Sequence, residues 1–263
     1  MSVAIVIPCF RQAQFLAAAI ESALDQTAAA AEIIVVDDGS DDDSSEVARR
    51  YREVELIRQD NRGLAAARNA GLRQARADKI IFLDADDRLL PSAVRAGLEC
   101  FAQEPAAAFV YGAFREVRGR SEHQRFVRAE SHTDLIRCNW IACVDAVMFD
   151  RAKLLAIGGF DQSLGMCEDW DAFLRLSRTH PFGSHQEAVA VYFKHDQNMS
   201  NDETMLLHWI DVVRSKELER GLDAEQLEAW REGEAIWRSF YDRNPQPRTA
   251  RIRGAISRLL GRR

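Results

Sequence analysis

The sequence lacks the features that mark secreted and membrane-spanning proteins. No stretch approaches the roughly 18 consecutive apolar residues of a membrane-spanning helix. Met1 and Ser2 lead directly into strand-like residues, without the basic region and cleavage site of a signal peptide. The five cysteines are odd in number and include no Cys-x-x-Cys pair, which argues against a disulfide framework or zinc site and for reduced thiols. We therefore expect a cytoplasmic protein.

Two common nucleotide-binding signatures are also missing. The sequence contains neither Gly-x-x-x-x-Gly-Lys-Ser/Thr nor Gly-x-Gly-x-x-Gly, which counts against P-loop ATPases and Rossmann dehydrogenases.

The 263 residues are 47% hydrophobic and 29% charged, enough to bury a substantial core. The formal net charge is -6, but residues 248–263 carry six arginines and no acid, so residues 1–247 sum to -12. Such an acidic body is a poor partner for nucleic acid.

Strand-like apolar runs alternate with amphipathic helical stretches in the first part of the chain. From Phe15 to Leu24, apolar residues recur at spacings of three and four, which predicts a helix. Short connections and right-handed crossovers turn such a series into a mostly parallel, Rossmann-like α/β sheet with helices on both faces. The four apolar runs are Val3–Pro8, Glu32–Val36, Val54–Arg58 and Lys79–Leu83.

The rest of the chain is less regular until it becomes helical. Residues 92–103 and 168–178 show helical spacing, residues 107–114 read as a strand, and residues 115–150 form a mixed region. The four alanines at 28–31 read as the end of a helix. The helical pattern beyond Thr204 predicts a C-terminal helical extension.

Three carboxylates follow the fourth apolar run, in the segment Leu83-Asp84-Ala85-Asp86-Asp87. Ligands of open α/β sheets bind at the carboxyl ends of the strands, and a hard divalent cation relieves the repulsion of clustered carboxylates. Asp-x-Asp also occurs at Asp41 and at Asp169, and surface pairs of this kind are usually turns or helix caps. Since Asp84 and Asp86 directly follow a buried strand, they are the copy that predicts a metal holding a phosphorylated substrate.

Two other turns carry polar residues of interest. Asp38 follows the second predicted strand and has the acceptor-only chemistry that suits a ring N–H of uracil or guanine, although an ordinary turn fits equally well. Gly63 stands at a predicted helix N-terminus, where free N–H groups favour an anion, and Arg68 lies about one turn further and would reach the same diphosphate. The alternative for this segment is an alanine-rich packing helix.

Taken in order, these motifs resemble the inverting GT-A glycosyltransferases of family 2. The resemblance covers residues 3 to 200, and Arg11 departs from it because asparagine is usual there. Its motifs are Ile5-Val6-Ile7-Pro8-Cys9-Phe10, Val35 to Ser40, Asn61 to Gly71, Leu83 to Asp87, Gly158-Gly159-Phe160-Asp161 with Glu168-Asp169-Trp170-Asp171, and Phe193 to Ser200.

The resemblance implies a GT-A-type fold that binds a nucleotide-diphosphate sugar and a glycan or lipid-linked acceptor. It implies a domain over residues 1–204, with a nucleotide-sugar half at 1–115 and an acceptor half at 116–204, followed by a helical extension at 205–263. Donor contacts fall on Pro8, Asp38, Gly63, Arg68 and Asp84, and ligands for manganese or magnesium on Asp86 and His195.

An acceptor hydroxyl must lose its proton during transfer, so the reaction needs a carboxylate base. The expected base is Asp169, with Glu168 as the second choice. Each assignment has a plain structural alternative, which is an acid favoured by a helix dipole or, for His195, a structural histidine.

Two other functions are compatible with this composition. A sugar-nucleotide nucleotidyltransferase also uses a mononucleotide fold with a metal, but it needs a glycine- and arginine-rich loop after the first strand, where this chain has Pro8-Cys9-Phe10-Arg11. A catalytically inactive sugar-nucleotide-binding module is disfavoured because the acids of both motifs are present.

The basic tail predicts peripheral membrane contact. Apolar residues recur at helical spacing in this tail and are accompanied by basic residues. Each basic residue near an anionic leaflet contributes about 1 kcal/mol to the free energy of binding. The alternatives are packing on the acidic body and a solvated end. If the tail binds membrane, the full chain should co-sediment with anionic vesicles at low salt, while a version ending at Pro247 should not. Equal pelleting of both versions would contradict this prediction. The apolar set is Ile252, Ala255, Ile256, Leu259 and Leu260.

Overall fold

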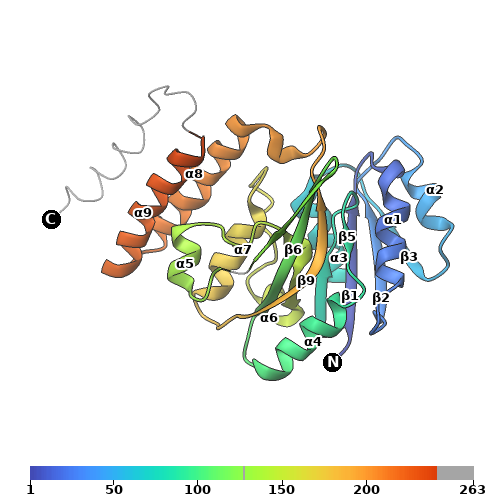
Figure 1. Ribbon diagram of the computed structural model, residues 1–263. Coiled ribbons are helices and arrows are strands. Elements are labelled where there is room, and N and C mark those ends of the chain that lie inside the picture. Colours follow the sequence, from blue (N-terminus) through green and yellow to red (C-terminus); the bar gives the residue numbers. More distant parts are fainter. Residues whose placement is uncertain (127, 242–263) are drawn as a thin grey trace.

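The computed structural model describes residues 1–126 and 128–241 (Figure 1). Within these residues, nine strands form one sheet in the order β3-β2-β1-β4-β8-β6-β9-β5, with β7 paired to β6. The strands are β1 (Val3–Cys9), β2 (Glu32–Asp37), β3 (Val54–Arg58), β4 (Lys79–Phe82), β5 (Arg88–Leu89), β6 (Phe109–Arg118), β7 (Ser121–Arg125), β8 (Val147–Asp150) and β9 (Gly183–Phe193).

The helices surround this sheet, and two short 3-10 turns interrupt the loops. They are α1 (Ala13–Leu24), α2 (Ser44–Arg49), α3 (Leu64–Gln74), α4 (Ala93–Gln103), α5 (His132–Arg137), α6 (Arg151–Ala156), α7 (Glu168–Ser177), α8 (Glu203–Glu219) and α9 (Ala224–Tyr241), with η1 (Val144–Ala146) and η2 (Met199–Asn201).

The first four long strands form the predicted parallel sheet. β1 lies between β2 and β4 and runs parallel to both, and β2 runs parallel to β3. Every residue of β1 is buried, as expected for a parallel strand covered on both faces. The carboxyl ends of these strands therefore meet at one edge, where the acid-rich turns follow.

The second half of the sheet is mixed. β8 lies between β4 and β6 and runs antiparallel to both, while β6 and β9 pair in parallel. β8 and β7 fall in the region that the sequence left irregular, and β9 had no predicted strand. The α/β fold with a C-terminal helical extension is confirmed, although only the β1–β4 half is uniformly parallel.

Helices cover both faces of the sheet, as predicted. Along β1, Val3, Ile5 and Ile7 face a cluster built with α1, α2 and α4, whereas Ala4 and Val6 face a cluster built with α3, α6 and α7. Figure 1 shows α1 and α2 on one side of the sheet and α7, α8 and α9 on the other. Successive side chains of a strand point to opposite faces of the sheet, and both faces of β1 are covered by helices. A strand rich in valine and isoleucine therefore suits the centre of the fold.

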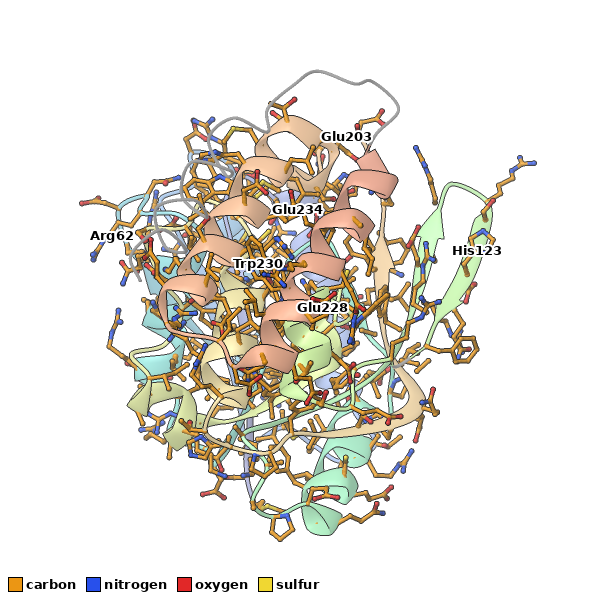
Figure 2. The ribbon with its side chains drawn as sticks, turned by 90° about the vertical axis from the view of Figure 1, so that its left-hand side faces the viewer. Arg62, His123, Glu203, Glu228, Trp230 and Glu234 are labelled. Atoms are coloured by element: carbon orange, nitrogen blue, oxygen red, sulfur yellow. The ribbon has the colours of Figure 1, made fainter. Side chains whose placement is uncertain are left out.

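The C-terminal helices share the core of the preceding residues. Ile210 and Val213 of α8, and Ala229 and Trp230 of α9, belong to the same hydrophobic cluster as Trp170 of α7. Figure 2 shows α8 and α9 side by side, with Trp230 between them; its indole Nε1 donates to the Arg214 carbonyl at 3.0 Å. None of the helices in the described residues has the length and apolar character needed to cross a bilayer. The tail at 248–263 lies outside the described residues.

One local prediction is wrong. The alanines at 28–31 do not end a helix, because α1 stops at Leu24 and residues 25–31 form the connection to β2. The Thr27 N–H instead donates to the Pro91 carbonyl at 2.8 Å, so this segment is held by a distant part of the chain.

Candidate active site

The acidic turn after β4 is held in place by a neighbouring loop. The Asp84 N–H donates to the Asp145 carboxylate at 2.6 Å, and the Asp87 N–H donates to the Asp84 carbonyl at 3.0 Å. Asp145 lies in η1, directly before β8, which is the neighbour of β4 in the sheet. The turn thus takes its shape from a residue about 60 positions away, which the sequence pattern did not single out.

Asp84, Asp87 and Asp145 form a compact carboxylate cluster. One oxygen from each lies within 4.8 Å of the other two, and both Asp87 and Asp145 are buried. Burial, reinforced by the charge of Asp84, raises the pKa of Asp145 to about 7, and burial with the charge of Asp145 raises that of Asp87 well above its usual value. A hard cation with oxygen ligands fits this donor set, since it would relieve the repulsion.

Asp86 is not one of these three residues and contacts His195 instead. Its Oδ2 lies 3.0 Å from Nε2 of His195, the pair that the resemblance assigned to the metal. The imidazole stacks on Phe15, with the ring centroids 5.0 Å apart, and its Nδ1 accepts the Gln197 N–H at 3.2 Å, which leaves Nε2 as the nitrogen that faces Asp86. Burial, followed by the charge of Asp84, raises the pKa of Asp86. The two predicted ligands therefore lie together, while their metal role stays a prediction.

Arg68 joins the two acidic motifs. Its Nη2 donates to Asp84 at 2.7 Å, and its Nη1 forms an ion pair with Glu168, although the two acids are 84 positions apart in sequence. The Arg68 side chain is nearly inaccessible, at 3% exposure. Burial alone lowers the pKa of Arg68, but the charges of Asp84 and Glu168 outweigh it and raise the pKa above its usual value. The residue predicted to reach a diphosphate is thus held between carboxylates in this structure.

The two acids at the start of α7 have different surroundings. Glu168 is buried in its pair with Arg68, whereas Asp169 is partly accessible and accepts only the N–H of Trp170, at 2.7 Å, among the described hydrogen bonds. Burial, followed by the charge of Glu168, raises the pKa of Asp169 from 3.8 to about 7, although Arg68 lowers it. A carboxylate that titrates near neutrality suits a general base.

Asn69, the residue after Arg68, ties α3 to the segment that precedes α7. Its side-chain amide donates to the Phe160 carbonyl at 2.7 Å and accepts the Phe160 N–H at 2.8 Å. Gly159 has a φ of +73°, and a Cβ placed on it would lie 2.3 Å from Oδ1 of Asn69. Two motifs that stand about 90 residues apart in sequence therefore meet through one amide, with no room for a side chain between them.

Two of the other predicted donor residues, Asp38 and Gly63, contact each other. The Asp38 carboxylate accepts the N–H groups of Arg62, at 3.0 Å, and Gly63, at 2.8 Å, as well as Nε2 of Gln59 at 2.6 Å. Gly63, with a φ of +88°, directly precedes α3. Pro8 is buried in β1 and pairs with Val36. Asp38 and Gly63 thus shape the loop before α3, and their nucleotide contacts stay predictions. Figure 2 labels Arg62 at the surface.

Comparison with known proteins identifies the class of this site. Residues 4–149 match the family model described as Glycosyl transferase family 2. A chondroitin synthase from Escherichia coli is 28% identical over 208 residues, which make up 75% of this chain and 30% of that protein. An uncharacterized glycosyltransferase from Haemophilus influenzae is 27% identical over 175 residues, which make up 61% of this chain and 58% of that protein. The chain thus spans less than two thirds of either relative.

Solved structures with this fold include two proteins in complex with a nucleotide or a nucleotide sugar. S. aureus TarS 1-349 in complex with UDP superimposes with a TM-score of 0.74 and 16% identity, covering 93% of this chain and 74% of that one. The mannosyltransferase PcManGT from Pyrobaculum calidifontis, in complex with GDP-Man and Mn2+, superimposes with a TM-score of 0.67 and 16% identity, covering 98% and 80%. At this identity the likeness shows the fold.

Proposed function

The chain belongs to glycosyl transferase family 2, and we propose that this glycosyltransferase moves a sugar, with inversion, from a nucleotide-diphosphate sugar to a hydroxyl of a glycan or lipid-linked acceptor. The observation that carries the proposal is the Arg68 bridge, which brings the donor-side Asp84 and the acceptor-side Glu168 to one guanidinium. A reaction centre between donor and acceptor requires such proximity of the two motifs.

On the donor side, Asp86 and His195 would hold manganese or magnesium, and Asp84 would face the ribose. When bound there, the ion would supply Lewis-acid stabilisation of the departing diphosphate. The 3.0 Å contact between Asp86 and His195 supports this pair of ligands, and the neighbouring cluster of Asp84, Asp87 and Asp145 supports a cation at this turn. Mn2+ and a nucleotide sugar in the structure of PcManGT support it further.

On the acceptor side, Asp169 would take the proton of the attacking hydroxyl. Glu168 is the weaker candidate because its ion pair with Arg68 stabilises the carboxylate and occupies an oxygen that a base needs free. We propose a role in assembling a bacterial cell-surface polysaccharide, and the name of the chondroitin synthase relative supports a role in polysaccharide synthesis. We place the enzyme on the cytoplasmic side, with the basic tail at 248–263 as its contact to the membrane.

The metal assignment is tested by Asp86→Ala. We expect this variant to lose the Mn2+-dependent gain in affinity for UDP or GDP, because it removes a charged oxygen ligand and leaves His195 without its partner. Isothermal titration with and without Mn2+ measures the gain. The matched control is Asp43→Ala, an exposed acid from another Asp-x-Asp pair. An unchanged gain in Asp86→Ala would remove this residue from the metal site.

A donor screen with the wild-type chain tests the function itself. Transfer of a sugar to an added acceptor, with release of a nucleoside diphosphate, is the expected result. Nucleotide binding without any turnover would favour the inactive binding module, and formation of a sugar nucleotide from a sugar phosphate would favour a nucleotidyltransferase.

The raised pKa of Asp169 predicts the pH dependence of transfer. A base acts in its deprotonated form, so the rate should rise with pH through about 7 and level off above it. Stability should change in the opposite sense, because native Asp169 keeps its proton to higher pH than the unfolded chain does. Between pH 3.8 and about 7 the native state binds more protons, so its free energy of unfolding falls as pH rises. Asp169→Asn should weaken this fall in urea titrations across the same range.

A further inference from the structure

The segment that leads to the proposed base is held from two sides. On one side α3 holds it, through Asn69 to Phe160 and Arg68 to Glu168. On the other side lies α8, and all of this helix except its first two residues is beyond the predicted domain limit at residue 204. The contacts of α8 are therefore the less expected ones.

Two cations at the end of α8 bind the acids on either side of the base. Lys216 forms an ion pair with Asp161, which lies at the start of the loop, and its Nζ is 3.8 Å from Asp171. Arg220, directly after α8, donates to the other end of the segment, at Asp171, over 2.8 Å. Asp161 and Asp171 thus bracket Asp169 in sequence, and both are fixed to the same helix end.

Asp171 is the fully buried member of this set. Its carboxylate is inaccessible, and it also accepts Nε of Arg175 at 2.7 Å. Arg175 in turn donates to the carbonyls of Ile157 and Gly159 at 2.9 and 2.7 Å. A buried carboxylate with three cationic neighbours costs stability if its partners are removed, so this network fixes the position of α7 closely.

An aromatic contact completes the attachment. A Cβ on Gly165 would lie 2.8 Å from the ring of Trp209, so the indole of α8 packs directly on the loop backbone two residues before Cys167. Leu164 of the loop and Ile210 of α8 lie in the same hydrophobic cluster. The loop therefore has little freedom to move independently of α8.

We propose that α8 is a positioning element of the transferase: Trp209, Lys216 and Arg220 hold residues 161–171 in place, so that Asp169 is aligned with the acceptor hydroxyl. The catalytic unit then extends past residue 204 to the end of α8. The part of this inference that concerns transfer rests on the proposed function, whereas the structural part does not.

The test is the double variant Lys216→Met/Arg220→Met, compared with Arg214→Met. Arg214 is a buried cation on the same helix, but it donates to the Trp230 carbonyl of α9 and so perturbs α8 away from the loop. In the double variant we expect faster amide hydrogen exchange in residues 158–171 and a loss of kcat of about 10- to 100-fold. The Kd for UDP or GDP with Mn2+ should change by less than about twofold, because donor contacts are untouched.

The control should keep both the exchange pattern of residues 158–171 and kcat per folded molecule. If the double variant does not fold, Lys216→Met alone leaves Asp171 with Arg175 and Arg220 and gives a smaller change of the same kind. Arg220→Lys keeps the positive charge at this position, so a kcat close to that of the wild-type chain in this variant would support positioning by charge.

Unchanged exchange in residues 158–171 would overturn the proposal, as would an equal loss of kcat in Arg214→Met. If the wild-type chain shows no transfer with any donor, the proposed function fails, but the exchange measurement still decides whether α8 holds the loop.

Discussion

Asp169→Asn is expected to keep nucleotide affinity and to lose sugar transfer by about 10²- to 10⁴-fold, the usual contribution of a general base. The amide preserves the shape of the side chain, and Oδ1 still accepts the Trp170 N–H. It has no basic oxygen for the acceptor proton. Steady-state kinetics with the donor found in the screen, together with calorimetric binding of UDP or GDP, separate the effect on chemistry from that on binding.

Glu168→Gln is the paired variant for this test. It weakens the ion pair with Arg68 and should therefore reduce stability, while a folded fraction retains measurable transfer. Persistent transfer in Asp169→Asn, with complete loss in Glu168→Gln, would assign the base to Glu168.

Arg68→Met should cause the largest loss of stability of any single substitution discussed above. Removing one partner of a buried ion pair leaves an uncompensated charge and typically costs about 3 to 5 kcal/mol. Most of this loss should come from Glu168, because its carboxylate is 6% exposed, whereas that of Asp84 is 31% exposed and retains water. Urea denaturation monitored by tryptophan fluorescence gives the free energy of unfolding.

Arg73→Met provides the control on the same helix. Arg73 is exposed on α3, so its loss should change the free energy of unfolding by about 0.5 kcal/mol or less. If Arg68→Met behaves like this control, Glu168 and Asp84 do not depend on the guanidinium, and the bridge is not a structural element of the site.

The sequence was sufficient to predict the first half of the fold. Four apolar runs with helical connections specify a parallel sheet, and the acid-rich turns then fall at one edge because parallel strands end together. His195 reached Asp86 as expected, but this pairing came from the resemblance to a family, since nothing in the local pattern relates residues 109 positions apart.

Other parts of the site could not be predicted from the sequence, because they depend on contacts between distant segments. Asp145 stands in an irregular stretch, and its role appears only when β8 pairs with β4 and brings it beside Asp84. Asp87 had no assigned role in the sequence, yet its carboxylate accepts the Phe193 N–H at 2.7 Å. The carboxylate partners of Arg68 were not predicted, because helical spacing predicts the face of a residue and not which acids approach that face.

The pairing of β5 with β9 has a consequence for how the chain is synthesised. Arg88 pairs with Val191 and Leu89 with Ala190, so β5 remains without its partner until about 100 more residues have left the ribosome. At about 5 to 20 residues per second, that interval lasts about 5 to 20 seconds. During this time the turn between β4 and β5 has neither partner at first. Asp145 is synthesised before the residue that supplies the second partner, the Phe193 N–H. The acidic turn therefore cannot take its final shape until β9 has been synthesised, whereas the strands β1–β3 have their pairing partners much earlier.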